Sequence, residues 1–116
     1  MTERISEADF QQRSEEAIAR LERAFGELAE TRDIDVRMEG GVLSVEFEEG
    51  EPGKFIVSPN SSARQLWVSA RMGSYKFDWS DQAGEFMLAG AGAGETLNLV
   101  LTRLTREQLG ENELTL

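Results

Sequence analysis

The chain contains no cysteine and no histidine. Without cysteine it can form no disulfide, no thiolate metal site and no cysteine-ligated cluster. Without histidine, acyl-transfer triads and histidine general-base catalysis are excluded. Any metal site must therefore be built from oxygen ligands, which suit hard or borderline cations better than structural zinc or copper.

Long apolar runs are also absent, since none approaches the ~20 residues that a transmembrane helix needs. The opening Met1-Thr2-Glu3-Arg4 leads directly into helix-like sequence. It has neither the apolar core of a signal peptide nor the Arg-rich, acid-poor composition of a transit segment. We therefore expect a cytoplasmic protein without membrane contact.

Basic residues are outnumbered, because 12 Lys and Arg stand against 22 Asp and Glu, giving a formal net charge of -10. This charge repels nucleic acid phosphates and attracts cations and basic protein surfaces. We expect no nucleic-acid partner, with an acidic DNA mimic left open as an alternative. The length of 116 residues predicts one domain, 1–116, around a core of modest size.

Two helices are predicted at the ends of the chain. Residues 7–30 carry an apolar stripe at steps of three and four, with Ser6 as N-cap and Asp9 three residues later. Residues 95–107 carry a second stripe of Leu97, Leu101 and Leu104. Leu109, Leu114 and Leu116 in the tail are expected to pack against these helices. The glycines at 90, 92 and 94 lack P-loop or dinucleotide spacing and indicate a flexible connector.

Alternating apolar and polar residues between the helices predict an antiparallel sheet. We expect strands at 33–38, around 43–47, and at 55–57, 65–71, 75–79 and 85–88, with connections at 49–53 and 58–63. The predicted fold class is α+β: a two-layer α-β sandwich in which the N- and C-terminal helices pack on one face of a five- to six-stranded sheet. The other face is expected to be open.

The dipeptide Gly40-Gly41 predicts a tight hairpin, because glycine supplies the positive φ angles of a two-residue turn. In that register Asp35 faces Glu46, and Asp33 faces Glu48. Like charges directly opposite each other destabilise a sheet by up to about 1 kcal/mol per pair. A cation or a partner's basic side chains would relieve this repulsion, unless the carboxylates simply splay into water.

Further acidic residues lie on the first helix. Glu16 precedes Arg20 by four residues and Arg23 precedes Glu27 by four, so these are expected to neutralise each other. Glu15 and Glu22 have no basic residue three or four positions away. Together with the hairpin acids they form what we call the acidic ridge, a candidate site for weak, exchangeable metal binding: Glu15, Glu22, Asp33, Asp35, Glu46 and Glu48.

Trp67 lies on the polar side of its predicted strand, in line with Gln65 and Ser69. An indole among polar groups suggests a surface for a partner protein. The alternative is that a loop or Arg71 covers it.

Five segments carry more information together than alone: Asp33-Ile34-Asp35, Gly40-Gly41-Val42-Leu43, Gln65-Leu66-Trp67-Val68-Ser69, Tyr75-Lys76-Phe77-Asp78-Trp79 and Gly94-Glu95-Thr96. In this order they resemble the frataxin family in its bacterial, CyaY-like form, over about Phe10 to Arg106. The resemblance implies a small α-β sandwich that binds ferrous or ferric iron weakly through carboxylates. It also implies docking on the cysteine desulfurase and the scaffold of iron-sulfur cluster assembly.

The resemblance assigns partner contacts to a set that we call the recognition face: Asn60, Gln65, Trp67, Ser69 and Lys76. The chain departs from the family pattern in two places. Ser58 and Asn60 replace two residues that contact the scaffold in relatives. Basic or neutral residues stand where the family often has acids: Arg23, Gly26, Ala29, Thr31 and Arg37.

We therefore expect an iron-binding protein of iron-sulfur cluster assembly, an iron donor or sensor that regulates the desulfurase-scaffold complex and is not itself an enzyme. Two alternatives stay open, an acidic adaptor without iron function and a weak ferroxidase. A monomer is expected, with iron-driven oligomerisation left open.

Overall fold

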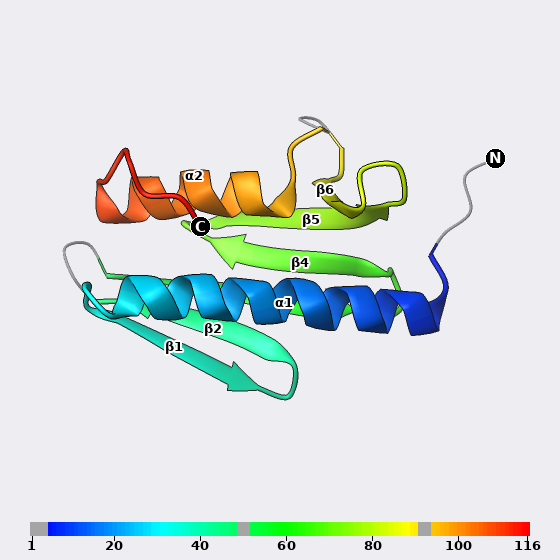
Figure 1. Cartoon of the computed structure of the whole chain (residues 1–116), viewed down its shortest axis with the longest axis horizontal. Helices are drawn as coiled ribbons and strands as arrows, with labels where there is room; N and C mark the ends of the chain where they lie inside the picture. The colour runs from blue at the N-terminus through cyan, green and yellow to red at the C-terminus, as the bar shows by residue number, and fades with distance from the viewer. Residues whose placement is uncertain (1–4, 49–51, 91–93) are drawn as a thin grey trace.

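A computed structural model describes residues 5–48, 52–90 and 94–116 of the chain. Two helices lie on one face of a six-stranded antiparallel sheet (Figure 1), as the sequence predicted. The elements in chain order are α1 (Glu7–Ala29), β1 (Ile34–Glu39), β2 (Val42–Phe47), β3 (Gly53–Asn60), β4 (Gln65–Ala70), β5 (Gly73–Ser80), β6 (Glu85–Leu88) and α2 (Leu97–Leu109). No helix in these ranges is long and apolar enough to span a bilayer.

Helix α1 begins as the sequence predicted, because the side chain of Ser6 accepts a hydrogen bond from the Asp9 backbone N–H at 3.1 Å. The apolar stripe faces the sheet. Its buried members are Phe10, Ser14, Ile18, Leu21 and Phe25. The polar member, Ser14, donates its hydroxyl to the Gln11 carbonyl at 3.0 Å, which makes its burial tolerable.

The core is centred on phenylalanines contributed by both layers. Phe25 of α1 meets Phe47 and Phe55 of the sheet edge-on, with ring centroids 6.4 Å apart in each case. At the other end of α1, Phe10 meets Phe86 edge-on at 6.1 Å. These perpendicular arrangements are favourable for aromatic rings and anchor the helix at both ends.

The sheet is a meander with strand order β1-β2-β3-β4-β5-β6. The predicted hairpin is confirmed: Gly40 and Gly41 have φ of 57° and 82°, and Asp35 faces Glu46. Met38 lies opposite buried Leu43, on the side of the sheet that faces the helices, yet it is 37% exposed. Figure 1 shows why, because the β1–β2 hairpin diverges from α1 toward its tip.

Strand β3 is longer than predicted. Residues 58–60, expected in a loop, continue the strand and pair with β4, and only 61–64 form the turn. Pro59 lies within this added segment, although a proline cannot donate a hydrogen bond to a ladder. Pairing of β3 with β2 ends at Val57, so Pro59 lies where β3 has a partner on one side only. The predicted turn at 49–53 falls mostly outside the described residues.

The β4–β5 turn consists of Arg71 and Met72, which have φ of 48° and 65°. Both therefore occupy the left-handed region that favours glycine. Arg71 is held there by contacts with α2: its guanidinium donates to Gln108 at 2.9 Å and lies 3.7 Å from the Glu107 carboxylate. The Met72 side chain projects entirely into solvent.

Helix α2 begins and ends two residues later than predicted. Thr96 caps its first turn through a hydrogen bond from the Leu99 N–H, so Glu95 lies before the helix. Gly110 ends it in the left-handed conformation, with φ of 68°. Of the three connector glycines, Gly92 falls outside the described residues.

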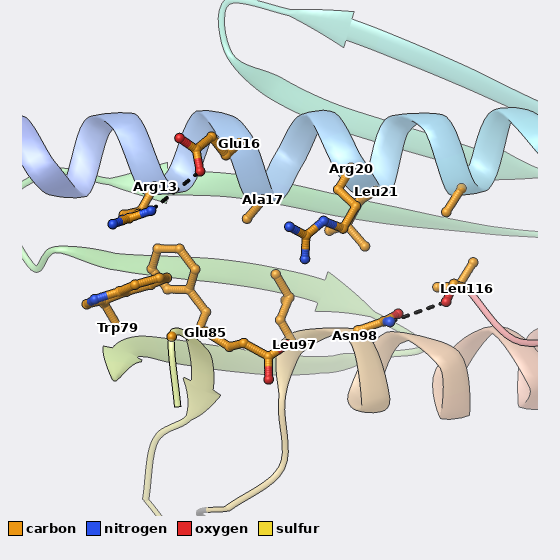
Figure 2. A pocket seen from close by; sticks show the side chains of 13 residues that line it. Arg13, Glu16, Ala17, Arg20, Leu21, Trp79, Glu85, Leu97, Asn98 and Leu116 are labelled. Atoms are coloured by element: carbon orange, nitrogen blue, oxygen red, sulfur yellow. Dashed lines mark hydrogen bonds and ion pairs between the residues drawn. The ribbon is translucent and has the colours of Figure 1, made fainter. Parts of the chain in front are cut away.

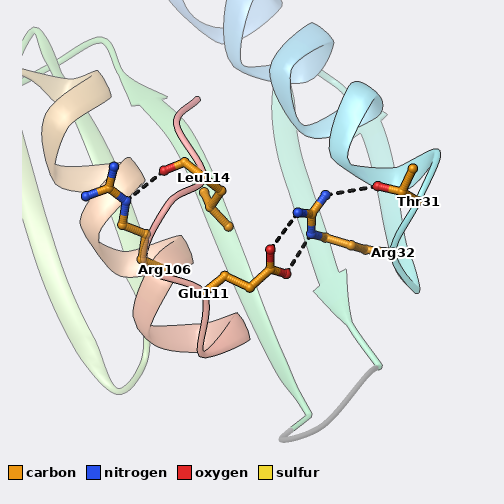
Figure 3. Close-up of polar contacts among 5 residues, drawn as sticks. All are labelled: Thr31, Arg32, Arg106, Glu111 and Leu114. Carbon is orange, nitrogen blue, oxygen red and sulfur yellow. Dashed lines mark hydrogen bonds and ion pairs between the residues drawn. The ribbon is translucent and has the colours of Figure 1, made fainter.

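The tail after α2 packs as the sequence predicted. Leu114 is buried at 8% exposure, and its carbonyl accepts a 2.7 Å hydrogen bond from Arg106. Figure 3 shows the second attachment of the tail. Arg32, just after α1, donates hydrogen bonds to both carboxylate oxygens of Glu111 at 2.7 and 2.6 Å. This bidentate ion pair attaches the tail to the segment that follows α1.

The Arg32–Glu111 pair makes stability pH-dependent. The hydrogen bonds from Arg32 hold the pKa of Glu111 below its ordinary value of 4.5. The stabilisation is therefore complete above that ordinary pKa and is lost as pH falls through the lower folded-state pKa. Glu111→Gln should lower the melting midpoint at pH 7, and the difference from the parent should close at acid pH, once the pH is below the folded-state pKa of Glu111.

The matched control is Glu113→Gln, a change of an exposed carboxylate in the same tail. It should leave the melting midpoint nearly unchanged at both pH values. Equal melting of the Glu111→Gln variant and the parent at pH 7 would show that the pair does not hold the tail.

Candidate functional site

The candidate site lies on the face of the sheet that no helix covers. Along each strand every second side chain points to this face. Cross-strand pairing aligns Asp35 of β1, Glu46 of β2 and Lys54 of β3 in one row. Two rows further along, Ser58, Trp67 and Lys76 are aligned in the same way. The hairpin acids and the predicted tryptophan surface thus share one face.

The facing carboxylates of Asp35 and Glu46 each have a basic neighbour. Arg37 Nε donates to Asp35 Oδ2 at 2.8 Å, and Lys54 Nζ lies 4.0 Å from Glu46 Oε1. Together with Glu39 and Ser44 these four side chains line a shallow hollow of about 110 Å³. The predicted charge repulsion across the hairpin is therefore offset within the chain.

The charge state of Arg37 reflects this arrangement. Its hydrogen bond to Asp35, followed by the negative charges of Asp35 and Glu46, raises the pKa of Arg37 above its ordinary value. The guanidinium stays charged at any physiological pH. A cation that binds Asp35 must therefore compete with Arg37.

The structure divides the acidic ridge into two groups. Asp33 and Glu48 continue the hairpin, with the Glu48 N–H donating to the Asp33 carbonyl at 3.1 Å. Glu15 and Glu22 are exposed on α1, which belongs to the opposite layer, and Glu15 accepts a 3.4 Å hydrogen bond from Gln11. In the described part of the chain, no group of three or more acidic side chains is placed to hold a metal ion.

The recognition face is a connected set of polar contacts around one indole. Trp67 is 36% exposed, its Nε1 donates to Gln65 at 3.0 Å, and the Lys76 ammonium lies 4.7 Å above its ring. Gln65 in turn donates to Asp78 at 3.0 Å. The amide and the cation fix the position of the indole, which stays partly exposed to solvent. The cation above the ring is Lys76, whereas the guanidinium of Arg71 contacts Gln108 and Glu107 of α2.

The remaining members of the recognition face differ in role. Ser69 is exposed two residues beyond Trp67 on the same face. Asn60 lies opposite Gln65, but its side-chain oxygen accepts a 2.9 Å hydrogen bond from the Ala63 N–H. Asn60 thus stabilises the β3–β4 turn as well as bordering the face.

Sequence reasoning missed the basic partners of the hairpin acids. Arg37 was detectable, since it follows Asp35 by two residues and therefore points to the same face. Lys54 was not detectable, because its position opposite Glu46 depends on the register between β2 and β3. The sequence that connects the two strands does not specify a turn type, so it does not fix that register.

Comparison with known proteins gives one consistent result. A family model described as "Frataxin-like domain" matches residues 3–111. The iron-sulfur cluster assembly protein CyaY of Azotobacter vinelandii is 37% identical over 109 residues, covering 92% of each chain. The CyaY of Stutzerimonas stutzeri is 44% identical over 79 residues, 68% of each chain. The solved frataxin of Psychromonas ingrahamii has the same fold, with a TM-score of 0.77 and 19% identity over 93% of this chain and 95% of that one.

The internal neutralisation of the hairpin can be tested by removing Arg37. Arg37→Gln leaves Asp35 facing Glu46 without its closest counterion, so the melting midpoint should fall at low salt. At about 1 M salt, where the screening length is about 3 Å, the difference from the parent should largely vanish. Thermal melts followed by circular dichroism over a salt series measure both effects.

Arg23→Gln is the matched control, since it removes the same charge from an exposed position on α1 in the other layer. Any general effect of lowering the basic content will appear in both variants. Equal shifts for the two would show that Arg37 has no special relation to the hairpin acids.

Proposed function

Because this chain belongs to the frataxin-like family, we propose that it acts in iron-sulfur cluster assembly as a regulator of the cysteine desulfurase-scaffold complex and as a donor or sensor of iron. The observation that carries this proposal is the 37% identity to an iron-sulfur cluster assembly protein over 92% of both chains. The absence of cysteine is consistent with it, because the chain can bind neither the cluster nor transferred sulfur through a thiolate and must act on proteins that do.

The recognition face supports docking on a protein partner. A partly exposed indole, fixed by Gln65 and Lys76, is a rigid aromatic anchor of the kind that dominates binding energy at interfaces. It lies on an open sheet face whose polar side chains are already ordered by contacts with one another. Such preorganisation lowers the entropy lost on association.

In this proposal iron is cargo that binds weakly at the open-face part of the acidic ridge. Asp35 and Glu46 offer two facing carboxylates, and oxygen ligands suit ferrous and ferric iron. Both carboxylates have basic neighbours at 2.8 and 4.0 Å, so iron must displace Arg37 or Lys54 or share the carboxylates with them. Binding of this kind is weak and readily reversed, which suits transfer or sensing.

One observation favours a second candidate function, an acidic adaptor without an iron role. The same two ion pairs that weaken iron binding leave the hairpin preorganised to exchange partners with another protein's basic side chains. Anaerobic titration with ferrous iron, followed by NMR line broadening, distinguishes the two functions. Oxygen consumption in the same titration tests the remaining alternative, ferroxidase activity.

The iron proposal predicts where broadening occurs. Asp35→Asn combined with Glu46→Gln should abolish the broadening of β1 and β2 resonances, because it removes both facing carboxylates. The control Glu15→Gln with Glu22→Gln, on the other layer, should leave that broadening intact. Broadening confined to α1 in the parent would place iron on the other group, and no saturable broadening anywhere would favour the adaptor.

The docking proposal predicts that Trp67→Ala separates folding from binding. Replacing a core tryptophan by alanine costs about 3 to 5 kcal/mol, whereas a partly exposed one should cost far less. Loss of an aromatic anchor should weaken binding to the desulfurase-scaffold complex by about 2 kcal/mol or more. Thermal melts and titration calorimetry with the purified complex measure the two quantities.

Leu99→Ala is the control, because Leu99 is 54% exposed on α2 in the opposite layer. It should change neither quantity appreciably. Parental affinity of the Trp67→Ala protein for the complex would refute the assignment of the recognition face.

A further inference from the structure

A second site lies on the other side of the molecule, between the helices. A cavity of about 240 Å³ opens between α1, α2 and the β5–β6 end of the sheet (Figure 2). Its walls are mainly apolar: Ala17, Leu21, Ala24, Trp79, Phe86, Leu97 and Leu116. The recognition face and the hairpin acids are on the opposite face of the sheet and contribute nothing to it.

The tryptophan in this wall is oriented by two contacts. Trp79 packs edge-on against buried Phe86 at 5.3 Å, and its Nε1 donates to Asp81 at 2.8 Å. The polar edge of the indole is therefore satisfied away from the cavity. The Arg13 guanidinium lies 5.0 Å from the centroid of the Trp79 ring and closes one end of the cavity. Leu116 borders the other end, where its carbonyl oxygen accepts a 3.2 Å hydrogen bond from the Asn98 side chain.

Arg20 supplies a cation directed into this cavity. The sequence predicted that it would pair with Glu16, but Glu16 instead lies 3.7 Å from Arg13. Figure 2 shows the Arg20 side chain extending from α1 toward α2, across the cavity. Among the described residues no hydrogen bond or ion pair engages its guanidinium. With no counterion in the described part of the chain, the Arg20 cation above this apolar cavity is complementary to a single negative charge on an apolar body.

We propose that this cavity binds a small amphipathic monocarboxylate, with its carboxylate on Arg20 and its apolar part against Trp79 and Leu97. The volume limits the size, because 240 Å³ corresponds to roughly eight groups of the size of water, each taking about 30 Å³. Glu85, on the opposite wall, disfavours a second negative charge on the ligand. A nucleotide is too large, and a dicarboxylate would bring its second charge toward Glu85.

The test uses hexanoate, which has eight non-hydrogen atoms, and hexanamide, which has the same shape without the charge. Binding is read from Trp79 fluorescence in a Trp67→Phe background, so that the signal comes from the cavity alone. Hexanoate should saturate this signal and bind more tightly than hexanamide. Arg20→Gln should weaken hexanoate binding at least about fivefold, as expected for loss of a charge-assisted hydrogen bond, while leaving hexanamide binding unchanged.

Two further variants complete the test. Arg23→Gln, an exposed cation on α1 that does not line the cavity, should not alter hexanoate binding. Ala17→Leu, which fills the cavity from α1, should abolish binding of both compounds. Equal affinity for hexanoate and hexanamide, or an unchanged affinity in Arg20→Gln, would overturn the proposal. Concentration-dependent self-association that both compounds reverse would assign the cavity to a second copy of the chain and would overturn it too.

Discussion

The packing of Phe25 on Phe47 and Phe55 is the contact on which the rest of the structure depends. It brings α1 against one face of the sheet at the end of β2 and the start of β3, where all three rings are fully buried. Side chains alternate between the two faces along a strand. Burying these two positions therefore determines which face each of the remaining residues in the six strands occupies. A shift of one residue in register would exchange the buried phenylalanines with Glu46 and Lys54, which no helix could cover.

The open face that results is acidic in composition but locally balanced. Each basic residue on it is used to hold a particular neighbour: Arg37 holds Asp35, Lys54 lies near Glu46, and Lys76 covers part of Trp67. These are solvent-exposed pairs, and pairs of this kind contribute little to stability. Breaking or rearranging these pairs therefore costs little free energy. A partner protein's charged side chains can replace an internal ion pair without a large desolvation penalty. The chain's net negative charge still attracts basic surfaces from a distance.

Much of the fold could be predicted because it rests on local signals. The stripe of α1, its Ser6 cap and the Gly40-Gly41 turn are each written within a few residues, and the turn alone set the pairing of Asp35 with Glu46. Features that depend on distant neighbours could not be predicted. Whether Pro59 belongs to a strand depends on where β2 stops, and how deeply Met38 is buried depends on where α1 lies.

The candidate sites divide in the same way. The face of Trp67 followed from alternation, but its fixation by Gln65 and Lys76 required the β4–β5 register. The cavity between the helices has no sequence signal, because its walls come from both ends of the chain. Helix spacing equally allowed Glu16 to pair with Arg20 or with Arg13. The choice of Arg13, next to Trp79, is what leaves Arg20 directed into the cavity.

The order of the strands has a consequence for how the chain folds. Every strand is hydrogen-bonded to its neighbours in sequence, so the whole sheet can form by successive closure of short hairpins. The bond between Arg32 and Glu111 joins residues 79 positions apart, and the entropy cost of closure grows with the length of the loop. We therefore expect the sheet and α1 to assemble before the tail docks. Docking of the tail would then be a late step in folding, and its main effect would be to lower the unfolding rate.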